Sequence, residues 1–242
     1  MTNAFSSTAT LKPPGGLALV IGASGGIGAA LLTQLQQDDR FERVLGLSRH
    51  SQPALDLLDE ASIAQAAAHV AGMCLPLRLL IDATGLLHGP GLQPEKTWQQ
   101  LDPVKMAQAF AINAIGPAML MKHFLPLLPR EGRSVFATLS AKVGSIGDNH
   151  LGGWYSYRAS KAALNQLVRT AAIELRRRQP QALCVALHPG TVATGLSAPF
   201  AKTGLQVQSP DHAAARLLGV IDGFQAADSG GFFNHDGSVL PW

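Results

Sequence analysis

Six short runs of apolar residues recur along the chain, each bounded by glycine, proline or another turn residue. They cover residues 17–23, 43–49, 77–85, 133–140, 182–190 and 230–237. Runs that are apolar at nearly every position are typical of strands buried on both faces of a sheet. We therefore predict that these runs form the strands of one sheet.

Helix-length segments separate the apolar runs. They show the 3.6-residue period or are rich in alanine and leucine, and they cover residues 27–37, 60–72, 103–127, 157–178 and 210–224. Alternating strands and helices predict an α/β fold in which a parallel sheet carries helices on both faces. No linker, repeat or low-complexity block interrupts the pattern. We predict one doubly wound domain over residues 15–242, after a loose N-terminal leader over residues 1–14.

The composition bears on partners. Hydrophobic residues make up 47% of the 242 residues and charged residues 14%, against roughly a quarter charged in an average domain. The surface is therefore sparsely charged, or much of it is buried in an oligomer. The net charge is +3, and the only cationic run is Arg176 to Arg178. A nucleic-acid interface needs a larger basic face with aromatic residues interleaved, so we predict no nucleic-acid partner.

Two cysteines, Cys74 and Cys184, lie in or beside apolar runs. Two are too few for a disulfide framework, and we expect buried free thiols in a reducing compartment. The N-terminus has no apolar core of a signal peptide, and no apolar stretch approaches the ~18 uninterrupted residues of a spanning helix. We predict a cytoplasmic protein without membrane contact. The histidines lack metal-ligand spacing, so no metal site is expected.

A glycine-rich turn follows the first predicted strand and opens the first predicted helix. Gly22, Gly26 and Gly28 are spaced as GxxxGxG. Glycines permit a tight turn and let a pyrophosphate approach the backbone amides at a helix N-terminus. A plain strand-to-helix turn is the alternative. The position after the first strand of an α/β pattern favours a dinucleotide site.

Tyr157 and Lys161 are four residues apart in a predicted helix and therefore share one face. An ammonium group beside a phenol favours the phenolate and lowers the pKa of the tyrosine. This would make Tyr157 an acid–base group near neutral pH. An exposed surface pair is the alternative for an isolated YxxxK. Tyr155 has Ala159 at the corresponding position and lacks such a partner.

Two polar residues support the catalytic interpretation. Ser140 ends a predicted strand before Tyr157 and could donate a hydrogen bond to a carbonyl group. Asn113 lies within a predicted helix, where asparagine is unfavourable unless its side chain serves a hydrogen bond.

Taken together, GxxxGxG, Asn113, Ser140, the YxxxK pair and the later Pro189-Gly190 resemble the short-chain dehydrogenase/reductase family over about residues 17–242. The stretch GSIGDNHLGGWYSYRASKAALN and the C-terminal DGSVLPW are similar to its C-factor and sniffer subgroup, which contains carbonyl reductases. The resemblance implies a Rossmann-type fold with about seven strands, and an NADP(H)-dependent oxidoreductase that acts on a carbonyl or alcohol substrate.

The resemblance also implies a role for each catalytic residue. Tyr157 would donate the proton to the substrate carbonyl. Lys161 would bind the nicotinamide ribose and lower the pKa of Tyr157. Ser140 would orient and polarise the carbonyl, and Asn113 would hold a water that links Lys161 to solvent. Tyr155 and His150 would border the substrate loop, without an assigned contact.

By the same resemblance, the dinucleotide would be bound by residues after successive strands. Asp82-Ala83-Thr84-Gly85 stands where family members usually have Asn-Asn-Ala-Gly, which leaves the side-chain bracing of the sheet there in doubt. The implied cofactor-binding residues are Gly22, Ser24, Gly25, Gly26, Ile27, Gly28, Ser48, Arg49, Asp56, Leu57, Ala83, Gly85, Asn113, Tyr157, Lys161, Pro189, Gly190, Val192 and Thr194.

Cofactor preference depends on the end of the second predicted strand. An acid there would bind the ribose hydroxyls of NAD and repel the 2′-phosphate of NADP. This chain has Ser48 and Arg49 instead, with no acid before Asp56. Arg49 can bind the phosphate with a charge-assisted fork, so the sequence favours NADP(H). A solvated strand-end charge is the alternative for Arg49.

Two classes of function remain open from the sequence. The first is an NADP(H)-dependent carbonyl reductase or alcohol dehydrogenase. The second is a dinucleotide-binding sensor or signalling protein with incidental catalysis, in which Tyr157 has no evident use. The segments 103–127 and 157–178 carry more apolar surface than one sheet face should need. We therefore predict a homodimer or homotetramer through these helices, as the family resemblance also implies.

Overall fold

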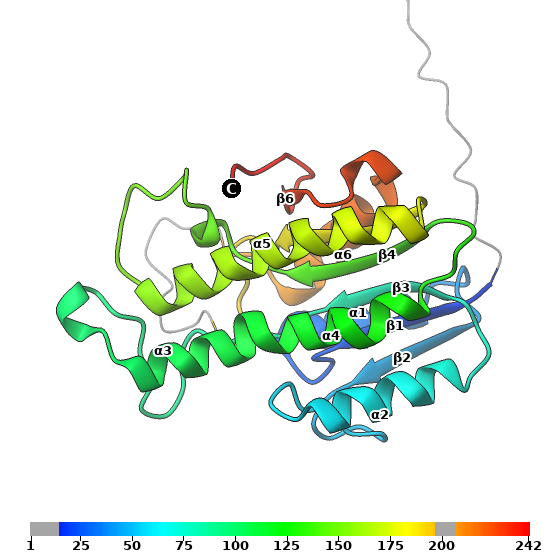
Figure 1. The fold of residues 1–242 in the computed structure, drawn as a ribbon, viewed down its shortest axis with the longest axis horizontal. Helices are drawn as coiled ribbons and strands as arrows, with labels where there is room; N and C mark the ends of the chain where they lie inside the picture. Colours follow the sequence, from blue (N-terminus) through cyan, green and yellow to red (C-terminus); the bar gives the residue numbers. More distant parts are fainter. Residues whose placement is uncertain (1–14, 197–206) are drawn as a thin grey trace, which may run out of the picture.

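The computed structural model describes residues 15–196 and 207–242; the predicted leader, residues 1–14, lies outside these ranges. In the described part, six parallel strands form one sheet in the order β2-β1-β3-β4-β5-β6 (Figure 1). The strands are β1 (Leu17–Ile21), β2 (Arg43–Leu47), β3 (Leu77–Asp82), β4 (Ser134–Leu139), β5 (Ala182–His188) and β6 (Phe232–Asn234).

All six strands coincide with the six apolar runs of the sequence. The predicted α/β fold is therefore confirmed, while the figure of about seven strands is too high by one for the described residues. The chain between β2 and α2 forms turns around Ser48 and Asp56 and adds no strand to the sheet.

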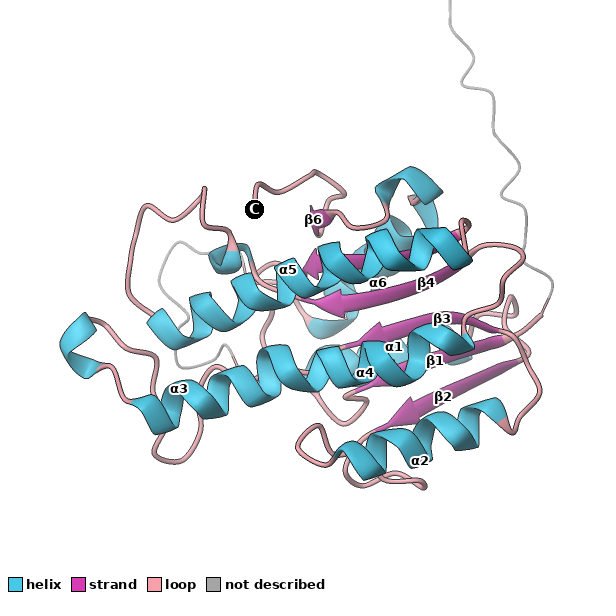
Figure 2. Ribbon diagram, viewed as in Figure 1, coloured by secondary structure: helices cyan, strands magenta, loops and turns pink. Residues whose placement is uncertain are grey.

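The helices lie in two layers, one on each face of the sheet (Figure 2). Their bounds are α1 (Gly26–Gln36), α2 (Glu60–Ala71), α3 (Pro103–Phe110), α4 (Gly116–Phe124), α5 (Tyr155–Arg178) and α6 (Pro210–Gly223), and a π-helical turn, Ala111–Ile115, joins α3 to α4. Alternate residues of β1 point to opposite faces. Leu17, Leu19 and Ile21 pack with residues of α2, α4 and α5. Ala18 and Val20 pack with residues of α1 and α6.

The stretch Pro103–Leu127 matches the predicted helix of residues 103–127. By length and composition alone it could cross a membrane, since its mean hydropathy is 1.2, and 39% of the apolar window lies buried in the fold. A core helix passes the same test. Within this stretch, α3 packs against α5 and α4 packs against α2, which accounts for many of its apolar residues. The absence of membrane contact stays a prediction.

The two cysteines differ in environment. Cys184 is buried in β5, and burial raises the pKa of its thiol to about 12. Cys74 is exposed, so the prediction of two buried thiols was wrong for this residue. Its backbone has a φ of 55° and lies in the turn between α2 and β3, where the neighbouring apolar residues do not enclose the side chain.

Candidate active site

Nearly all the predicted site residues lie at one edge of the sheet, beyond the carboxyl ends of the strands. This is the edge where ligands bind in open α/β sheets. The turns after β1, β3, β4 and β5 and the first turn of α5 meet there, as the contacts below show.

The turn after β1 folds tightly onto itself. Gly22 has a φ of 81°, and its amide donates to Leu47 O at the end of β2. A Cβ on Gly28 would lie 2.1 Å from Gly22 O, so only glycine allows the helix to start so close to the strand. The turn residues Ser24, Gly25 and Gly26 are exposed and Ile27 is partly exposed, which leaves the first amides of α1 accessible.

The N-terminus of α1 fits an anionic group. Gly25 is the N-cap and makes no side-chain capping bond, and the first turn carries no acid. A Cβ on Gly26 would lie 2.8 Å from Thr194 Cγ2, so the segment after β5 approaches the start of the helix. Free helix amides and the helix dipole favour a phosphate at this position. The residues therefore fit the pyrophosphate of a dinucleotide.

The segment after β5 is held by Gln208. Gln208 Nε2 donates to Pro189 O (2.7 Å), and Val192 forms a bridge with Gln208. Gly190 has a φ of 79°, and Val192 is buried. Of this loop, Thr194 lies beside the glycine turn, and the predicted contacts of Pro189, Gly190, Val192 and Thr194 with a nicotinamide cofactor stay predictions.

The end of β2 presents Ser48 and Arg49. Ser48 Oγ accepts a hydrogen bond from the His50 amide (3.1 Å), and its carbonyl accepts one from Ser51 Oγ (2.8 Å). Arg49 is exposed and makes no hydrogen bond or ion pair within residues 15–196 and 207–242. Its guanidinium is therefore available to a ligand.

Asp56 and Leu57 begin the connection to α2. The Asp56 carboxylate accepts from the Leu58 amide (3.0 Å), while the Asp56 amide donates to Ser62 Oγ (2.9 Å). Leu57 packs so close to Gly116 that a Cβ there would lie 2.8 Å from Leu57 Cβ. Both residues are partly buried. Their predicted contact with adenine stays a prediction.

The turn after β3 is braced by Asp82, which the sequence left in doubt. The buried Asp82 carboxylate accepts from Thr84 Oγ1 (2.6 Å) and Thr138 Oγ1 (2.7 Å), so it joins the ends of β3 and β4. Burial raises the pKa of Asp82 above its usual value. Ala83 lies against Gly22, because a Cβ on Gly22 would be 3.1 Å from Ala83 O.

Asn113 lies in the π-helical turn between α3 and α4 and is fully buried. Its Oδ1 accepts from the Leu86 amide (2.8 Å), and its Nδ2 donates to Leu86 O (2.8 Å) and Ser160 Oγ (3.1 Å). The side chain therefore ties the turn after β3 to α5. π-Helical turns are frequent at functional sites. The predicted contact of Asn113 with a water that links Lys161 to solvent stays a prediction.

Lys161 is buried, and its ammonium donates to Leu139 O (2.8 Å). A Cβ on Gly85 would lie 3.7 Å from both Lys161 Nζ and Asn113 Oδ1, so the three residues meet. Burial lowers the pKa of Lys161 to about 8, against the opposing charge of Asp82. An ammonium has three donors, and the Leu139 carbonyl occupies one.

Tyr157 lies in the first turn of α5, on the same face as Lys161. Its side chain is 9% exposed, and its ring meets Trp154 edge to face at 6.2 Å. Burial raises the pKa of Tyr157 above its usual value. The expected lowering of this pKa by Lys161 is therefore wrong, because burial alone sets the direction of the shift. The protonated phenol is the form that can donate a proton.

Ser140 follows β4 but faces away from Tyr157. Its Oγ donates to Asn165 Oδ1 (2.6 Å), one helical turn beyond Lys161. Ala141 instead packs against Tyr157 and Leu87. The predicted role of Ser140 in polarising a carbonyl is not supported by this placement. Tyr155 is partly exposed and His150 is exposed, and a substrate contact of either stays a prediction.

One buried acid at the site had no sequence signal. Glu95 is 4% exposed and accepts from the Ser156 amide (3.1 Å) and the Ser156 hydroxyl. A carboxylate at a helix N-terminus stabilises the helix, so Glu95 fixes the turn that carries Tyr157. The two residues are far apart in the sequence, and no periodicity links them.

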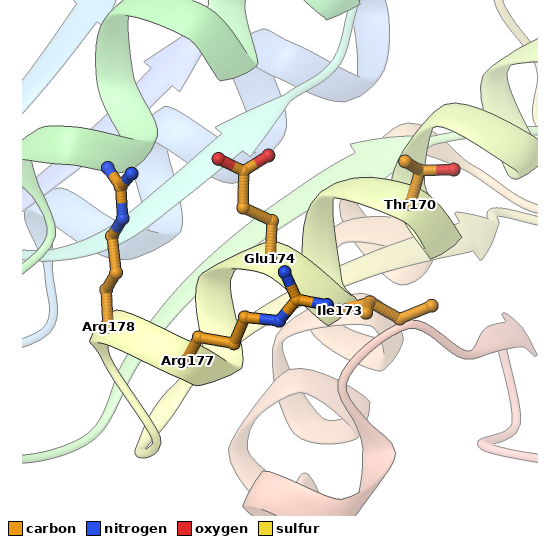
Figure 3. A pocket seen from close by; sticks show the side chains of 5 residues that line it. All are labelled: Thr170, Ile173, Glu174, Arg177 and Arg178. Carbon is orange, nitrogen blue, oxygen red and sulfur yellow. The ribbon is translucent and has the colours of Figure 1, made fainter.

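A shallow pocket elsewhere is separate from this site. It lies on the outer face of α5 and is lined by Thr170, Ile173, Glu174, Arg177 and Arg178 (Figure 3). Thr170 is about 20 Å from Tyr157 along the helix, at 1.5 Å per residue. The catalytic residues do not contribute to it.

Comparisons with known proteins agree with this geometry. The family model for short chain dehydrogenases matches residues 49–204. A 1-hydroxy-2-glutathionyl-2-methyl-3-butene dehydrogenase from Rhodococcus sp. is 32% identical over 93% of this chain and 98% of its own length. The protein named C-signal from Myxococcus xanthus is 38% identical over 59% of this chain and 81% of its own length.

Solved structures show the same fold. NADPH-bound carbonyl reductase from chicken fatty liver superposes with a TM-score of 0.80 at 28% identity, over 93% of this chain and 94% of that chain. The carbonyl reductase Sniffer of D. melanogaster gives a TM-score of 0.80 at 22% identity, over 94% and 99%. The chain therefore belongs to the short-chain dehydrogenase/reductase family of NAD(P)-dependent oxidoreductases.

Proposed function

We propose that this protein is an NADPH-dependent carbonyl reductase, with Tyr157 as the proton donor. The observation that carries the proposal is a buried Tyr157 on the same face of α5 as Lys161, whose ammonium lies beside Asn113 at Gly85. A bound dinucleotide would supply the hydride that adds to the carbonyl carbon. Tyr157 Oη would then protonate the oxygen, which gains the electron pair of the C=O π bond, and the product is an alcohol.

Lys161 has two functions in this proposal. Its ammonium holds the backbone at Leu139 and has donors left for the ribose hydroxyls of the dinucleotide. Its positive charge also stabilises the Tyr157 phenolate that forms after proton transfer. The Asn113 side chain holds Leu86 and Ser160 and so fixes the helix that carries both groups. Tyr157 would then be reprotonated from solvent through Lys161 and a water held by Asn113.

Preference for NADPH is supported by Arg49 and by the absence of an acid at the end of β2. Arg49 is exposed, close in sequence to Leu47, whose carbonyl accepts from the Gly22 amide. This joins the β2 end to the phosphate-binding turn. The chicken carbonyl reductase is described as NADPH bound, and a related structure from Burkholderia multivorans, 25% identical, contains NADP.

The surroundings of Tyr157 favour an apolar substrate. Leu87, Val143, Trp154 and Leu196 pack around Tyr157 and Ala141. These side chains provide apolar walls, so an aromatic or aliphatic carbonyl fits better than an ionic one. The experiment is a screen of aldehydes and ketones with NADPH, followed spectroscopically as NADPH is consumed. Failure of every uncharged carbonyl, with turnover of a charged one, would contradict this substrate class.

The second function to test is a dinucleotide-binding signalling protein, which the similarity to C-signal favours. The two candidates differ in what Tyr157 does. A carbonyl reductase loses its activity when Tyr157 becomes phenylalanine, whereas a signalling protein that only needs bound dinucleotide keeps its cellular effect. Cofactor binding by the variant, measured by NADPH fluorescence, is the control for both.

We also propose that the protein is a homo-oligomer through α4 and α5. Ile115 and Ile173 are 55% and 47% exposed. A groove between the two helices is lined by apolar residues such as Met121 and Leu175 and by the charged residues Lys122, Arg130, Glu174 and Arg178. No other element of the described chain covers this face (Figure 1). Light scattering at micromolar concentration should give a mass of two or four chains. A single species of 25.4 kDa would refute it.

A further inference from the structure

Ser140 and Ala141 are consecutive residues at the end of β4, and their side chains face opposite directions. Ala141 has an extended backbone, with φ of −145° and ψ of 142°. In extended chain, neighbouring side chains alternate between the two sides. Ser140 is 3% exposed, and its hydroxyl proton is donated to Asn165 Oδ1 of α5 at 2.6 Å. Ala141 therefore faces the other side.

On that other side lies Tyr157. Ala141 (8% exposed), Leu87 (7%) and Tyr157 (9%) form a small buried cluster. Val143, Trp154 and Leu196 pack against it. The Tyr157 hydroxyl accepts or donates no hydrogen bond within the described residues. A substrate oxygen at this hydroxyl would therefore meet the Ala141 methyl group and not a second hydroxyl.

We propose that Ala141 occupies the position from which a second donor would polarise the substrate carbonyl, and that Tyr157 alone binds the substrate oxygen. Ser140 then has a structural function, because it ties the end of β4 to Asn165 on the helix that carries Tyr157 and Lys161. The inference rests on the proposed carbonyl reduction and deepens it. It names Ala141 as a determinant of the substrates that the site can use.

A consequence follows for the substrate class. Donors aimed at the developing charge on an oxygen typically contribute a factor of 10² to 10³ each to the rate. A site with one donor polarises the carbonyl weakly and depends more on the substrate's own reactivity. Electron-poor aldehydes and activated ketones should therefore be reduced well, and simple ketones poorly.

The first test adds the missing donor. Ala141→Ser should raise kcat/KM about tenfold, and most for the least reactive carbonyls. Ala141→Cys has a similar shape and a weak donor, so it should change kcat/KM less than threefold. Along a series of para-substituted benzaldehydes, the rate should depend less steeply on electron withdrawal in Ala141→Ser than in the wild type. No gain for Ala141→Ser and an unchanged dependence would overturn the proposal.

The second test needs no activity. Ser140→Ala, Asn165→Ala and the double variant form a thermodynamic cycle in the thermal midpoint of unfolding. Each single variant should lower the midpoint, and the double variant should lower it by no more than the larger single effect, because the residues are one hydrogen-bonded pair. Additive effects, or an unchanged midpoint in Ser140→Ala, would overturn the structural function of Ser140.

Together the tests separate this inference from the proposed function. Under the inference, Ser140→Ala keeps kcat/KM within tenfold of the wild type. A loss of a hundredfold or more in Ser140→Ala at an unchanged midpoint, while Tyr157→Phe is also inactive, would leave carbonyl reduction standing and overturn the inference. If Tyr157→Phe retains full turnover, the proposed function fails, and the thermodynamic cycle still decides what Ser140 does.

Discussion

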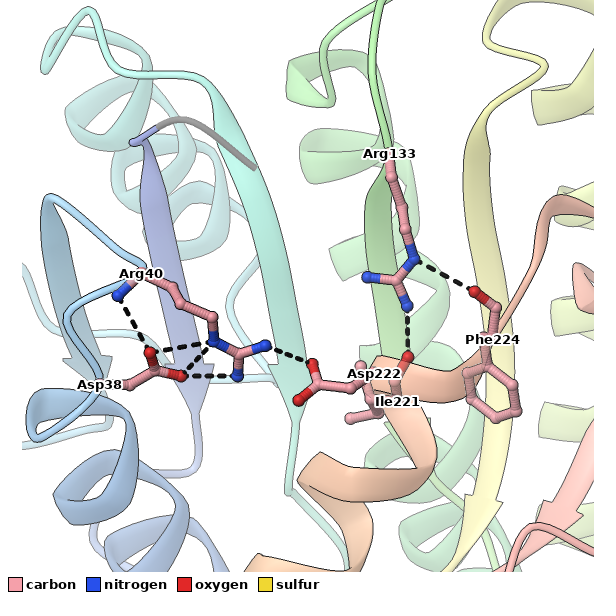
Figure 4. A network of polar contacts seen from close by, with 6 residues as sticks. All are labelled: Asp38, Arg40, Arg133, Ile221, Asp222 and Phe224. Carbon is pink, nitrogen blue, oxygen red and sulfur yellow. Dashed lines mark hydrogen bonds and ion pairs between the residues drawn. The ribbon is translucent and has the colours of Figure 1, made fainter. Parts of the chain in front are cut away.

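The two ends of the sheet use their polar groups differently. At the amino end, Arg40 donates to Asp38 (2.7 Å) and pairs with Asp222 of α6 (2.9 Å) (Figure 4). Both carboxylates raise the pKa of Arg40 above its usual value. This ion-pair network connects the loop before β2 to the end of α6.

A second arginine completes the amino end. Arg133, just before β4, donates to Phe224 O (3.2 Å) and to Ile221 O. These carbonyls belong to the last turn of α6, where a helix leaves acceptors without intrahelical partners. Arg133 satisfies them, so the amino end contributes mainly to holding strand and helix together.

The carboxyl end also pairs Asp82 and Asn113, but it keeps several other donors available. The first amides of α1, the Arg49 guanidinium and the Tyr157 hydroxyl make no side-chain hydrogen bonds in the described chain. Paired groups therefore maintain the fold at both ends of the sheet, while the carboxyl end alone combines them with the ligand-facing donors named above.

The strongest test of this comparison removes the Tyr157 hydroxyl. Tyr157→Phe should lower kcat by about 10³-fold, since it removes the general acid. Its thermal midpoint should stay the same, because the hydroxyl has no protein partner to lose. Tyr155→Phe is the matched control and should keep most of the activity. The assignment fails if the control is the inactive variant.

Arg49 sharpens the comparison at the binding end. Arg49→Ala should lower the ratio of kcat/KM for NADPH to that for NADH by ten- to a hundredfold, the equivalent of roughly 1.5–3 kcal/mol for a charged hydrogen bond. Arg49→Lys keeps the charge without the fork and should show an intermediate ratio. A wild-type ratio at or below one, or a ratio that Arg49→Ala does not move, contradicts this role.

Lys161 shows what burial at the binding end costs. Its folded pKa is about 8, below its usual 10.5, so between these pH values the unfolded chain binds more protons and the Lys161 contribution to stability rises with pH. The unfolding free energy of Lys161→Met minus that of the wild type should therefore fall by on the order of 1–2 kcal/mol between pH 7.5 and 10. Denaturant unfolding without cofactor measures it. A difference that does not vary with pH would show that Lys161 is not destabilised by burial.

The smallest effect is expected at the amino end. Arg40→Ala should lower the unfolding free energy by about 1 kcal/mol, because the pairs are only partly buried, and the thermal midpoint by about 2–4 °C. The kcat and the NADPH preference should not change. A loss of activity without a loss of stability would remove the separation between the two ends.

Much of this molecule could be predicted from the sequence. The six strands and the main helices follow from apolar runs and the 3.6-residue period, because burial on both faces of the sheet leaves a strong pattern. Tyr157 and Lys161 follow from their spacing on one helix. These features depend on residues near each other in the chain, where geometry is fixed by the helix itself.

The remaining features depend on contacts between distant residues. The direction of Ser140 is set by Asn165, and the brace at Asp82 is set by Thr138 in another strand. The burial that raises the pKa of Tyr157 comes in part from Leu87 and Ala141, which the sequence does not place beside it. Neither strand periodicity nor motif spacing contains this information.

Because of the π-helical turn at Ala111–Ile115, the number of residues in this stretch is itself a feature on which evolution can act. Each residue of an α-helix advances the chain by 100°, so losing one residue here would let the helix run regularly while turning Asn113 away from Leu86 and Ser160. Such a deletion would restore regular α-helical hydrogen bonding but would remove the contacts of Asn113 with Leu86 and Ser160. Selection on stability and selection on activity would therefore oppose each other at this turn. A count of residues between Asp102 and Pro117 is a simple marker for whether a related chain keeps this arrangement.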